Sequence, residues 1–182
     1  MRTAFVSVVA TAALLAGATG VARAAEPSNG PTLEQLIAAT RALAEQDVVM
    51  PIEEIRLAAQ LAALPEPDGT IAAVRSLFDH PSFHVRRVGI NAVRRIGRFA
   101  APGLLDALVA KLRDPAGWVR YDAAWALAEA KVDRADVRAE LERLANGAKI
   151  PTEAEWKTIP LGDSELRARI KAAEAVQAIG HR

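Results

Sequence analysis

The feature that most constrains the fold is a repeated helical pattern. A proline recurs after 34 residues, at Pro81 and Pro115, and matching residues follow each at the same distances. A chain that repeats itself at a period of about 20 to 50 residues folds as an array of similar units. The matching positions, copy by copy, are Pro51, Ile55-Arg56 and Ala62-Ala63; Pro81, Val85-Arg86 and Ala92-Val93; Pro115, Val119-Arg120 and Ala126-Leu127; and Ala168-Arg169 and Ala175-Val176.

A second amphipathic stretch precedes each copy, so each unit is predicted to be helix, turn, helix. Neither helix can bury its apolar stripe alone, and the units must therefore stack. Aromatic residues make up only 4% of the chain, and the aliphatic residues that dominate suit close helix packing. Asn146-Gly147 is a suitable left-handed end for one helix. The apolar positions of the preceding helices are Leu33, Leu36, Ile37 and Leu43; Ile71, Val74, Leu77 and Phe78; Leu104, Leu108, Val109 and Leu112; and Val137, Leu141 and Leu144.

The best copy reads Asp-Pro-Ala-Gly-Trp-Val-Arg-Tyr-Asp-Ala-Ala-Trp-Ala-Leu, from Asp114 to Leu127. It resembles a HEAT repeat, specifically the short bacterial HEAT-like type that is also found in phycobilisome lyases. The resemblance covers about Thr32 to Gly180. It implies an all-α fold, a right-handed α-solenoid of about four HEAT-like helix pairs. Such a scaffold hosts unrelated roles, so the resemblance indicates a fold and no particular function.

The resemblance implies a ladder that ties neighbouring units together and is made by the repeat Arg and an Asp six residues before it. Asp114/Arg120 and Asp163/Arg169 keep this spacing, whereas His80 precedes Arg86 and Met50 precedes Arg56. An Arg on the first helical turn also lies beside the preceding loop, where a carboxylate can accept two of its hydrogen bonds. We therefore predict structural roles for Arg56, Arg86, Arg120 and Arg169.

Residues 1–24 resemble a secretory signal peptide. Arg2 precedes an uncharged run from Thr3 to Val21, and Ala22-Arg23-Ala24 supplies the small residues that a signal peptidase requires. The alternative is an uncleaved membrane anchor, but this run is rich in Ala, Gly and Thr, which partition weakly into a bilayer. We expect a mature domain of residues 25–182 in a bacterial periplasm or outside the cell.

Composition and motifs argue against several classes of function. Loss of Arg2 and Arg23 lowers Lys+Arg from 23 to 21 against 22 Asp+Glu, so the mature net charge is −1 and no nucleic-acid partner is expected. The chain has no cysteine for thiolate chemistry. The histidines are His80, His84 and His181, and they lack the Glu of a zincin motif. We expect no metal, no cofactor and no enzymatic activity.

The second helix of each unit presents a face opposite its predicted buried stripe, and such arrays turn this face toward partners. Because Tyr, Trp and Arg dominate binding hot spots, we predict a site for an acidic protein segment or a carboxylate ligand at Arg87, Asn91, Arg94, Tyr121 and Trp125. The rows predicted on this face are Leu57, Leu61 and Leu64; Arg87, Asn91 and Arg94; Tyr121, Trp125 and Ala128; and Ile170, Glu174 and Gln177.

Packing offers an alternative for each of these residues. Tyr121 and Trp125 can pack on neighbouring helices or beneath arginine side chains, and residues 25–31 can cover the leucine row. Trp156, in the long connection of residues 148–163, is expected to pin that loop to the body rather than to anchor a partner.

The sequence thus favours an exported protein-interaction module or scaffold. The alternatives are an accessory or small-ligand-binding subunit of an extracytoplasmic enzyme system and, less favoured, an enzyme on a HEAT-like scaffold.

Overall fold

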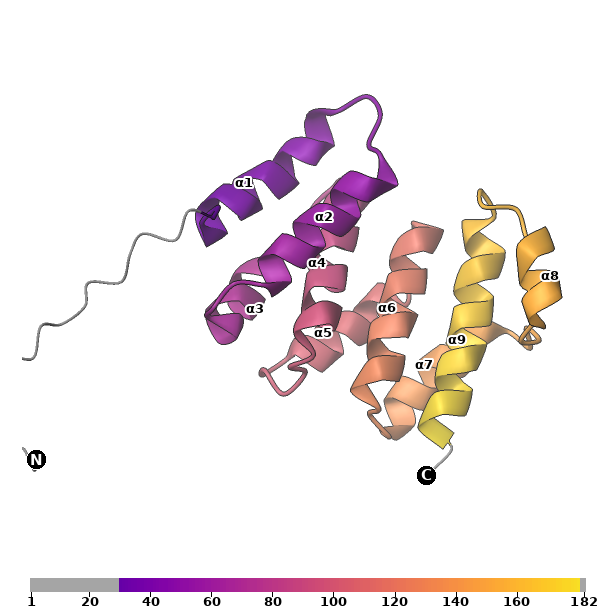
Figure 1. Cartoon of the computed structure of the whole chain (residues 1–182). Coiled ribbons are helices and arrows are strands. Elements are labelled where there is room, and N and C mark those ends of the chain that lie inside the picture. Colours follow the sequence, from indigo (N-terminus) through magenta and orange to yellow (C-terminus); the bar gives the residue numbers. More distant parts are fainter. Residues whose placement is uncertain (1–29, 181–182) are drawn as a thin grey trace, which may run out of the picture. The chain divides into compact units, whose positions relative to one another are not determined.

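The computed structural model describes residues 30–180, and the predicted signal peptide, Ala25 and His181 lie outside them. The described residues form helices and no strand, as the all-α prediction requires (Figure 1). None of these helices is long and apolar enough to span a bilayer. The helices are α1 (Leu33–Ala42), a 3-10 turn (Leu43–Glu45), α2 (Pro51–Ala62), α3 (Pro67–Arg75), α4 (Phe83–Ile96), α5 (Leu104–Lys111), α6 (Gly117–Ala130), α7 (Ala135–Ala145), α8 (Glu153–Thr158) and α9 (Ser164–Gly180).

Local sequence signals set several helix ends. Thr32 and Gln35 form a capping box at the start of α1, where each side chain accepts a hydrogen bond from the other's backbone N–H. Pro51 occupies the first position of α2, where a missing N–H leaves no helical bond unmade. Gly97 ends α4 with φ 71° and Asn146 ends α7 with φ 44°, so the predicted left-handed end at Asn146 is confirmed.

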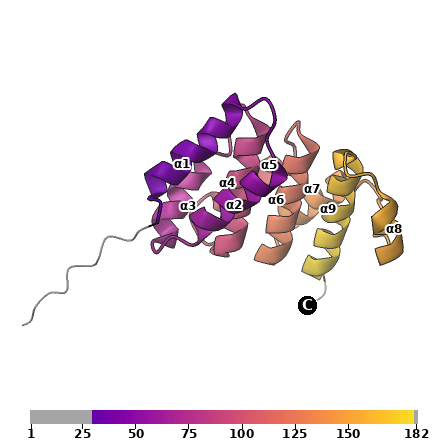
Figure 2. The same cartoon turned by 45° about the horizontal axis from the view of Figure 1, so that its top comes forward.

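Within residues 31–180 the second helices of the units lie side by side. α2 packs against α4, α4 against α6, and α6 against α9 (Figures 1 and 2). The shorter helices α3, α5 and α7 pack against α4, α6 and α9, respectively, and α1 packs against α2, α3 and α4. Each unit therefore contributes one long helix to a common row.

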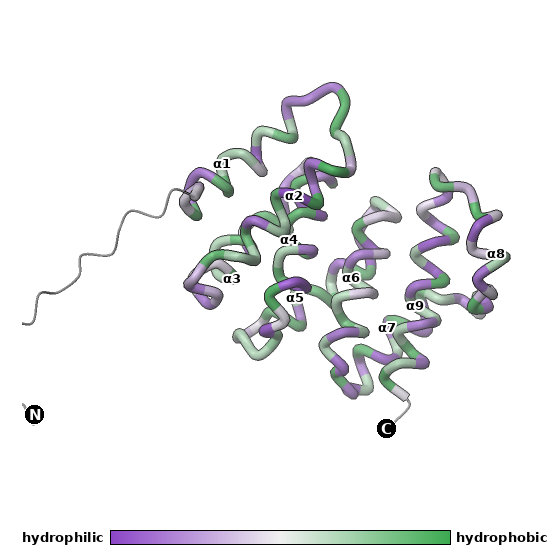
Figure 3. The backbone as a smooth tube through the Cα atoms, viewed as in Figure 1, coloured by the Kyte–Doolittle hydropathy of each residue, from purple (hydrophilic) through white to green (hydrophobic). Residues whose placement is uncertain are grey.

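One apolar core joins these helices. It extends from Leu36 in α1, through Leu61, Val85 and Leu127, to Ile179 in α9. Hydrophobic residues are accordingly distributed along every part of the array rather than concentrated in one helix (Figure 3). The predicted stripe positions Ala92, Val93, Ala126 and Leu127 are fully buried, so the helical phase predicted for α4 and α6 is confirmed.

The phase predicted for α2 is wrong. Leu57 and Leu61 were expected on the exposed face, but both are buried, whereas Ile55, the expected start of the buried stripe, is half exposed. The prediction aligned Pro51 with Pro81. Pro51 is the first residue of α2, but α4 begins at Phe83, two residues after Pro81. The burial pattern of α2 matches that of α4 after a shift of one residue, which turns a helix by about 100°.

Ile170 departs from its predicted exposure as well. It was placed on the outer row of α9, but it is buried. The same row is otherwise partly or fully accessible, since Glu174 is half-buried and Gln177 is exposed. Leu64, from the α2 row, packs partly buried against the core.

Two of the repeat arginines tie neighbouring units together, as the resemblance implied, but each does so through a carboxylate of the following unit. Arg86 bonds to the Asp114 carboxylate of the following unit at 2.8 Å, and Arg120 similarly pairs with Glu165. Arg86 and Arg120 also donate to backbone carbonyls of the loops that precede their own helices, and Arg169 donates to the carbonyls of Ala145 and Asn146. The carboxylate partners of Arg86 and Arg120 therefore do not lie six residues before them in the chain.

Two expectations about this ladder fail. Arg56 is exposed and bonds only weakly, at 3.4 Å to Gln60, because the rotation of α2 turns it away from the preceding loop. Asp163 accepts a hydrogen bond from the Leu166 backbone at the start of α9 instead of holding Arg169.

The long connection of residues 148–163 contains the short helix α8. Thr152 and Glu155 form a capping box at its start. The Arg167 guanidinium of α9 lies 5.3 Å from the centre of the Trp156 ring and donates hydrogen bonds to the carbonyls of Ile159 and Pro160. These contacts hold the Trp156 segment against α9, as the pinning interpretation expected.

Candidate functional site

The five predicted site residues lie together. Arg87, Asn91 and Arg94 of α4, and Tyr121 and Trp125 of α6, line one cavity of about 200 Å³. We call this cavity and its rim the α4–α6 groove. It forms because residues spaced three to four apart share a helix face and because α4 and α6 lie side by side. The other lining residues are Glu54, Ile55, Arg95 and Asp122.

A buried charge cluster forms the floor of the groove. The Arg87 guanidinium donates to Asp122 Oδ2 at 2.7 Å and to Glu54 Oε2 at 2.5 Å. Both carboxylates are almost fully buried, and Arg87 connects α2, α4 and α6. His84 Nδ1 lies 2.5 Å from the other oxygen of Glu54. The sequence assigned Arg87 to a partner, but its hydrogen bonds are made within the protein.

Burial and pairing oppose each other in this cluster. Burial raises the pKa of Asp122 above its ordinary value, and the nearby Arg87 charge offsets this only in part. For Arg87, burial lowers the pKa, but attraction to Asp122 and Glu54 and hydrogen bonds to both outweigh it, so the pKa of Arg87 is raised. Arg87 therefore remains charged, and its charge compensates those of the two buried carboxylates.

The aromatic side of the groove is built on α6. Trp118, Tyr121 and Trp125 follow at helical spacing and meet edge to face, with centroid distances of 5.7 and 6.0 Å. The Arg94 guanidinium lies 3.8 Å from the centre of the Trp125 ring, and Lys171 Nζ of α9 lies 5.2 Å from the same ring. Trp125 therefore lies within cation–π distance of two cations, and the packing alternative included arginine side chains over this ring.

Of the two arginines on the rim of the groove, Arg94 is bonded within the described part of the protein and Arg95 is not. Arg94 bonds to Glu129 at 2.9 Å and to Asn91 at 3.3 Å, which fixes its orientation. Arg95 is exposed and makes no hydrogen bond or ion pair with any described residue. The groove can therefore offer a ligand the unpaired guanidinium of Arg95 in a cavity that Tyr121 and Trp125 also line.

His80 and His84 do not converge on a common point. His80 Nδ1 accepts a hydrogen bond from the Ser82 backbone, whereas His84 faces Glu54. Across residues 30–180, no three His, Asp or Glu side chains gather in a way that could hold a metal ion.

Sequence reasoning missed Glu54, Asp122 and Lys171. Asp122 had a usable signal, because it is a charged residue within the buried stripe of α6 and requires a cation from a neighbouring helix. Glu54 had none until the phase of α2 was known. Lys171 lies on α9, forty-six residues after Trp125, and only the packing of α6 on α9 reveals it.

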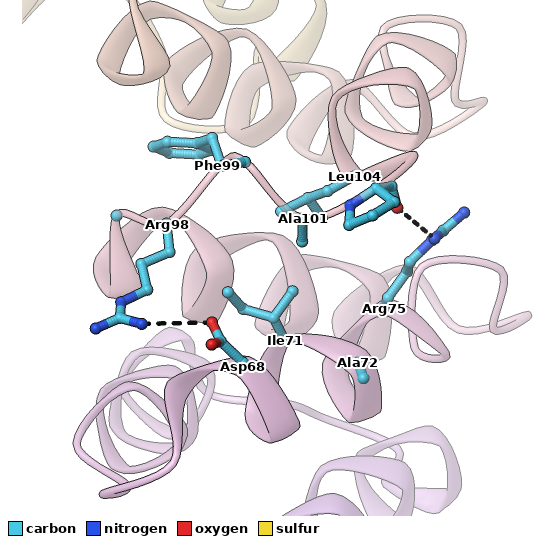
Figure 4. Close-up of a pocket in the computed structure, with 11 residues that line it drawn as sticks. Asp68, Ile71, Ala72, Arg75, Arg98, Phe99, Ala101 and Leu104 are labelled. Carbon is cyan, nitrogen blue, oxygen red and sulfur yellow. Dashed lines mark hydrogen bonds and ion pairs between the residues drawn. The ribbon is translucent and has the colours of Figure 1, made fainter.

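A larger and more apolar cavity lies elsewhere, between α3 and the connection from α4 to α5. Its volume is about 680 Å³, and Ile71, Ala72, Ala101 and Leu104 contribute apolar surface (Figure 4). Arg75 and Arg98 lie on opposite sides of it. Arg98 is 3.5 Å from Asp68, and Arg75 donates to the Pro102 carbonyl at 3.0 Å. We call this the α3 pocket.

Comparisons of the chain with protein-family models, with curated proteins and with solved structures found no match.

Proposed function

We propose that the protein is an interaction module that binds an acidic segment of a partner protein in the α4–α6 groove. In this proposal the helix pairs form a right-handed, HEAT-like α-solenoid, and the groove lies on its inner row of helices. The role is that of a binding protein or scaffold rather than an enzyme. The protein acts after export, in the periplasm or outside the cell, with residues 1–24 removed as a signal peptide.

The observation that carries the proposal is the combination of charge and aromatic surface in one groove. Arg95 is exposed without an ion pair, Arg94 is held in position by Trp125 and Asn91, and two aromatic rings stand beside them. A carboxylate can accept hydrogen bonds from these guanidinium groups, and the rings supply contact area at little cost in side-chain entropy. Because the groove is partly exposed, binding to it should weaken as salt increases.

The test compares variants for capture of a partner from extract of the cells that produce the protein. Trp125→Ala should weaken capture by about 2 kcal/mol of affinity, because it removes the ring that forms one wall. Arg95→Glu should slow association and flatten the salt dependence. Arg95 is chosen because it is exposed, so its replacement leaves the fold intact. Lys149→Glu makes the same charge change at an exposed site outside the groove and serves as the control.

Two results would count against the groove. In one, Trp125→Ala lowers the melting temperature but leaves partner capture unchanged, which would mean that the ring only packs. In the other, Arg95→Glu and Lys149→Glu reduce capture equally. The export proposal has its own test, since N-terminal sequencing of the secreted protein should give Ala25 as the first residue.

A small-ligand role is the second candidate, and the α3 pocket favours it. A volume of about 680 Å³ lies within the range of about 300 to 1,000 Å³ that is usual for ligand sites. Its apolar walls and flanking arginines suit an apolar molecule that carries one acidic group (Figure 4). Binding of 1-anilinonaphthalene-8-sulfonate to the folded protein, lost when Ala72→Trp fills the pocket, would support it. Equal binding to both proteins would reject it.

A further inference from the structure

Exposed apolar side chains gather at one place in the described part of the chain. Six large apolar residues are exposed among residues 30–180, and four of them lie within residues 48–55. These four are Val48 (72%), Met50 (56%), Ile52 (66%) and Ile55 (50%). Single exposed apolar residues are ordinary on protein surfaces, but a cluster of them marks an interaction site. The cluster covers the start of α2 and the turn that leads into it.

The helix α2 carries two apolar stripes. Leu57, Ala58 and Leu61 form the buried stripe. Ile52, Ile55, Ala59 and Ala62 are spaced by three, four and three residues and form a second stripe, which is exposed or partly exposed. This is the spacing with which one helix packs along another. A helix with apolar residues on two faces is usually covered on both, but residues 30–180 leave Ile52 and Ile55 of the second face exposed.

The second stripe continues into the α4–α6 groove. Ile55 belongs to the stripe and also lines the groove, together with Arg94 and Arg95. Glu54, the acidic residue next to Ile55, is buried and already bonded to Arg87 and His84. Arg95 is exposed and lines the same cavity as Ile55. Apolar surface on α2 thus adjoins a cationic edge on α4.

We propose that the partner segment is an amphipathic helix, which lays its apolar side on the second stripe of α2 and points its acidic side at Arg94 and Arg95. This rests on the proposed function and names the form of its partner. An amphipathic helix fits because its own residues at i, i+3 and i+7 match the spacing of Ile52, Ile55 and Ala59. An acidic flank fits because it supplies the carboxylate that Arg95 lacks.

The probe is a fluorescently labelled synthetic peptide of about 20 residues, long enough to form a helix when bound. It has Leu at the two apolar positions of each heptad and Glu on one flank. A second peptide replaces each Glu by Lys, and a third replaces each Leu by Ala. Fluorescence anisotropy with the mature chain should show binding of the first peptide at least about tenfold tighter than of the other two.

The variants separate the stripe from the groove. The double substitution Ile52→Ser with Ile55→Ser should weaken binding of the acidic peptide at least about tenfold, since it removes two apolar contacts at the centre of the interface. Both side chains are exposed, so circular dichroism should show an unchanged fold. Leu161→Ser is the matched control, because Leu161 is 78% exposed and lies before α9, outside the stripe. It should bind like the unaltered protein.

Three results would overturn the inference. The first is equal binding of the acidic and basic peptides. The second is acidic-peptide binding that Trp125→Ala weakens and the Ile52/Ile55 substitutions do not, which would leave the groove as the site without a helix on the stripe. The third is a dimer in light scattering that the Ile52/Ile55 substitutions convert to a monomer, which would show that a second copy of the chain covers the stripe.

Discussion

Replacement of Arg87 by methionine should destabilise the protein strongly. The side chain keeps its length but loses the charge that pairs with Glu54 and Asp122, both almost fully buried. Breaking a buried ion pair from one side costs about 3 to 5 kcal/mol, because the remaining charge stays buried without compensation. Glu54 keeps His84 as a neighbour and Asp122 keeps Asn91, so we expect the loss to fall near 3 kcal/mol.

The pH dependence of this loss follows from the direction of the Asp122 pKa shift. Burial raises the pKa of Asp122 above its ordinary 3.8, and Arg87→Met removes the attraction that opposes burial, so the pKa rises further. A carboxyl with a raised pKa favours the folded state below its unfolded pKa, and this contribution is lost as pH rises through the folded pKa. The destabilisation by Arg87→Met should therefore be larger at neutral pH than at about pH 4.

Urea denaturation followed by circular dichroism, at both pH values, measures the free energy of unfolding. Addition of Asp122→Asn to Arg87→Met should recover part of the lost stability, because it removes the unpaired charge. A loss below about 1 kcal/mol that is the same at both pH values would refute the view that Arg87 compensates buried charge.

Three further predictions concern stability and are measured by thermal or urea unfolding. Ala126→Asp should cost about 3 kcal/mol or more, since Ala126 is fully buried without a polar partner, whereas Ala128→Asp at a half-buried site should cost much less; equal losses would contradict the phase of α6. Gly117→Ala should cost about 1 to 3 kcal/mol, because a Cβ there would lie 2.5 Å from Ser164 Oγ, while Gly162→Ala meets no atom within 4 Å; an unchanged melting temperature for Gly117→Ala would mean that α6 and α9 pack less closely. Hydrogen bonds from Arg113 and Arg143 lower the pKa of Glu140 to about 2, so its contribution is present above its ordinary 4.5 and lost as pH falls toward 2; Glu140→Gln should be slightly less stable at neutral pH and equal to the unaltered protein near pH 2, and a constant difference would contradict the pairing.

The sequence predicted the individual helices well because local signals carry that information. Asn146 ends α7 in the left-handed conformation expected of it, and the buried Ala92 and Ala126 follow from helical periodicity alone. Periodicity also placed Arg87, Arg94 and Trp125 on one face, and the packing of α4 against α6 brings them together. Helical phase does not identify what these residues bind, and that inference rests on the chemical types of their side chains.

By itself, then, the sequence determined where helices form and which residues share a face on each helix, since both depend on contacts within a few residues. Only the tertiary structure decided which of two apolar stripes on α2 is buried, because Ile52 and Ile55 are as apolar as Leu57 and Leu61. The choice depends on which stripe packs against α4. The tertiary structure likewise decided that Arg87 bonds to Glu54 and Asp122, each more than 30 residues away along the chain. Charges at that separation meet only when stacked helices set their distance and orientation, and no local pattern encodes either.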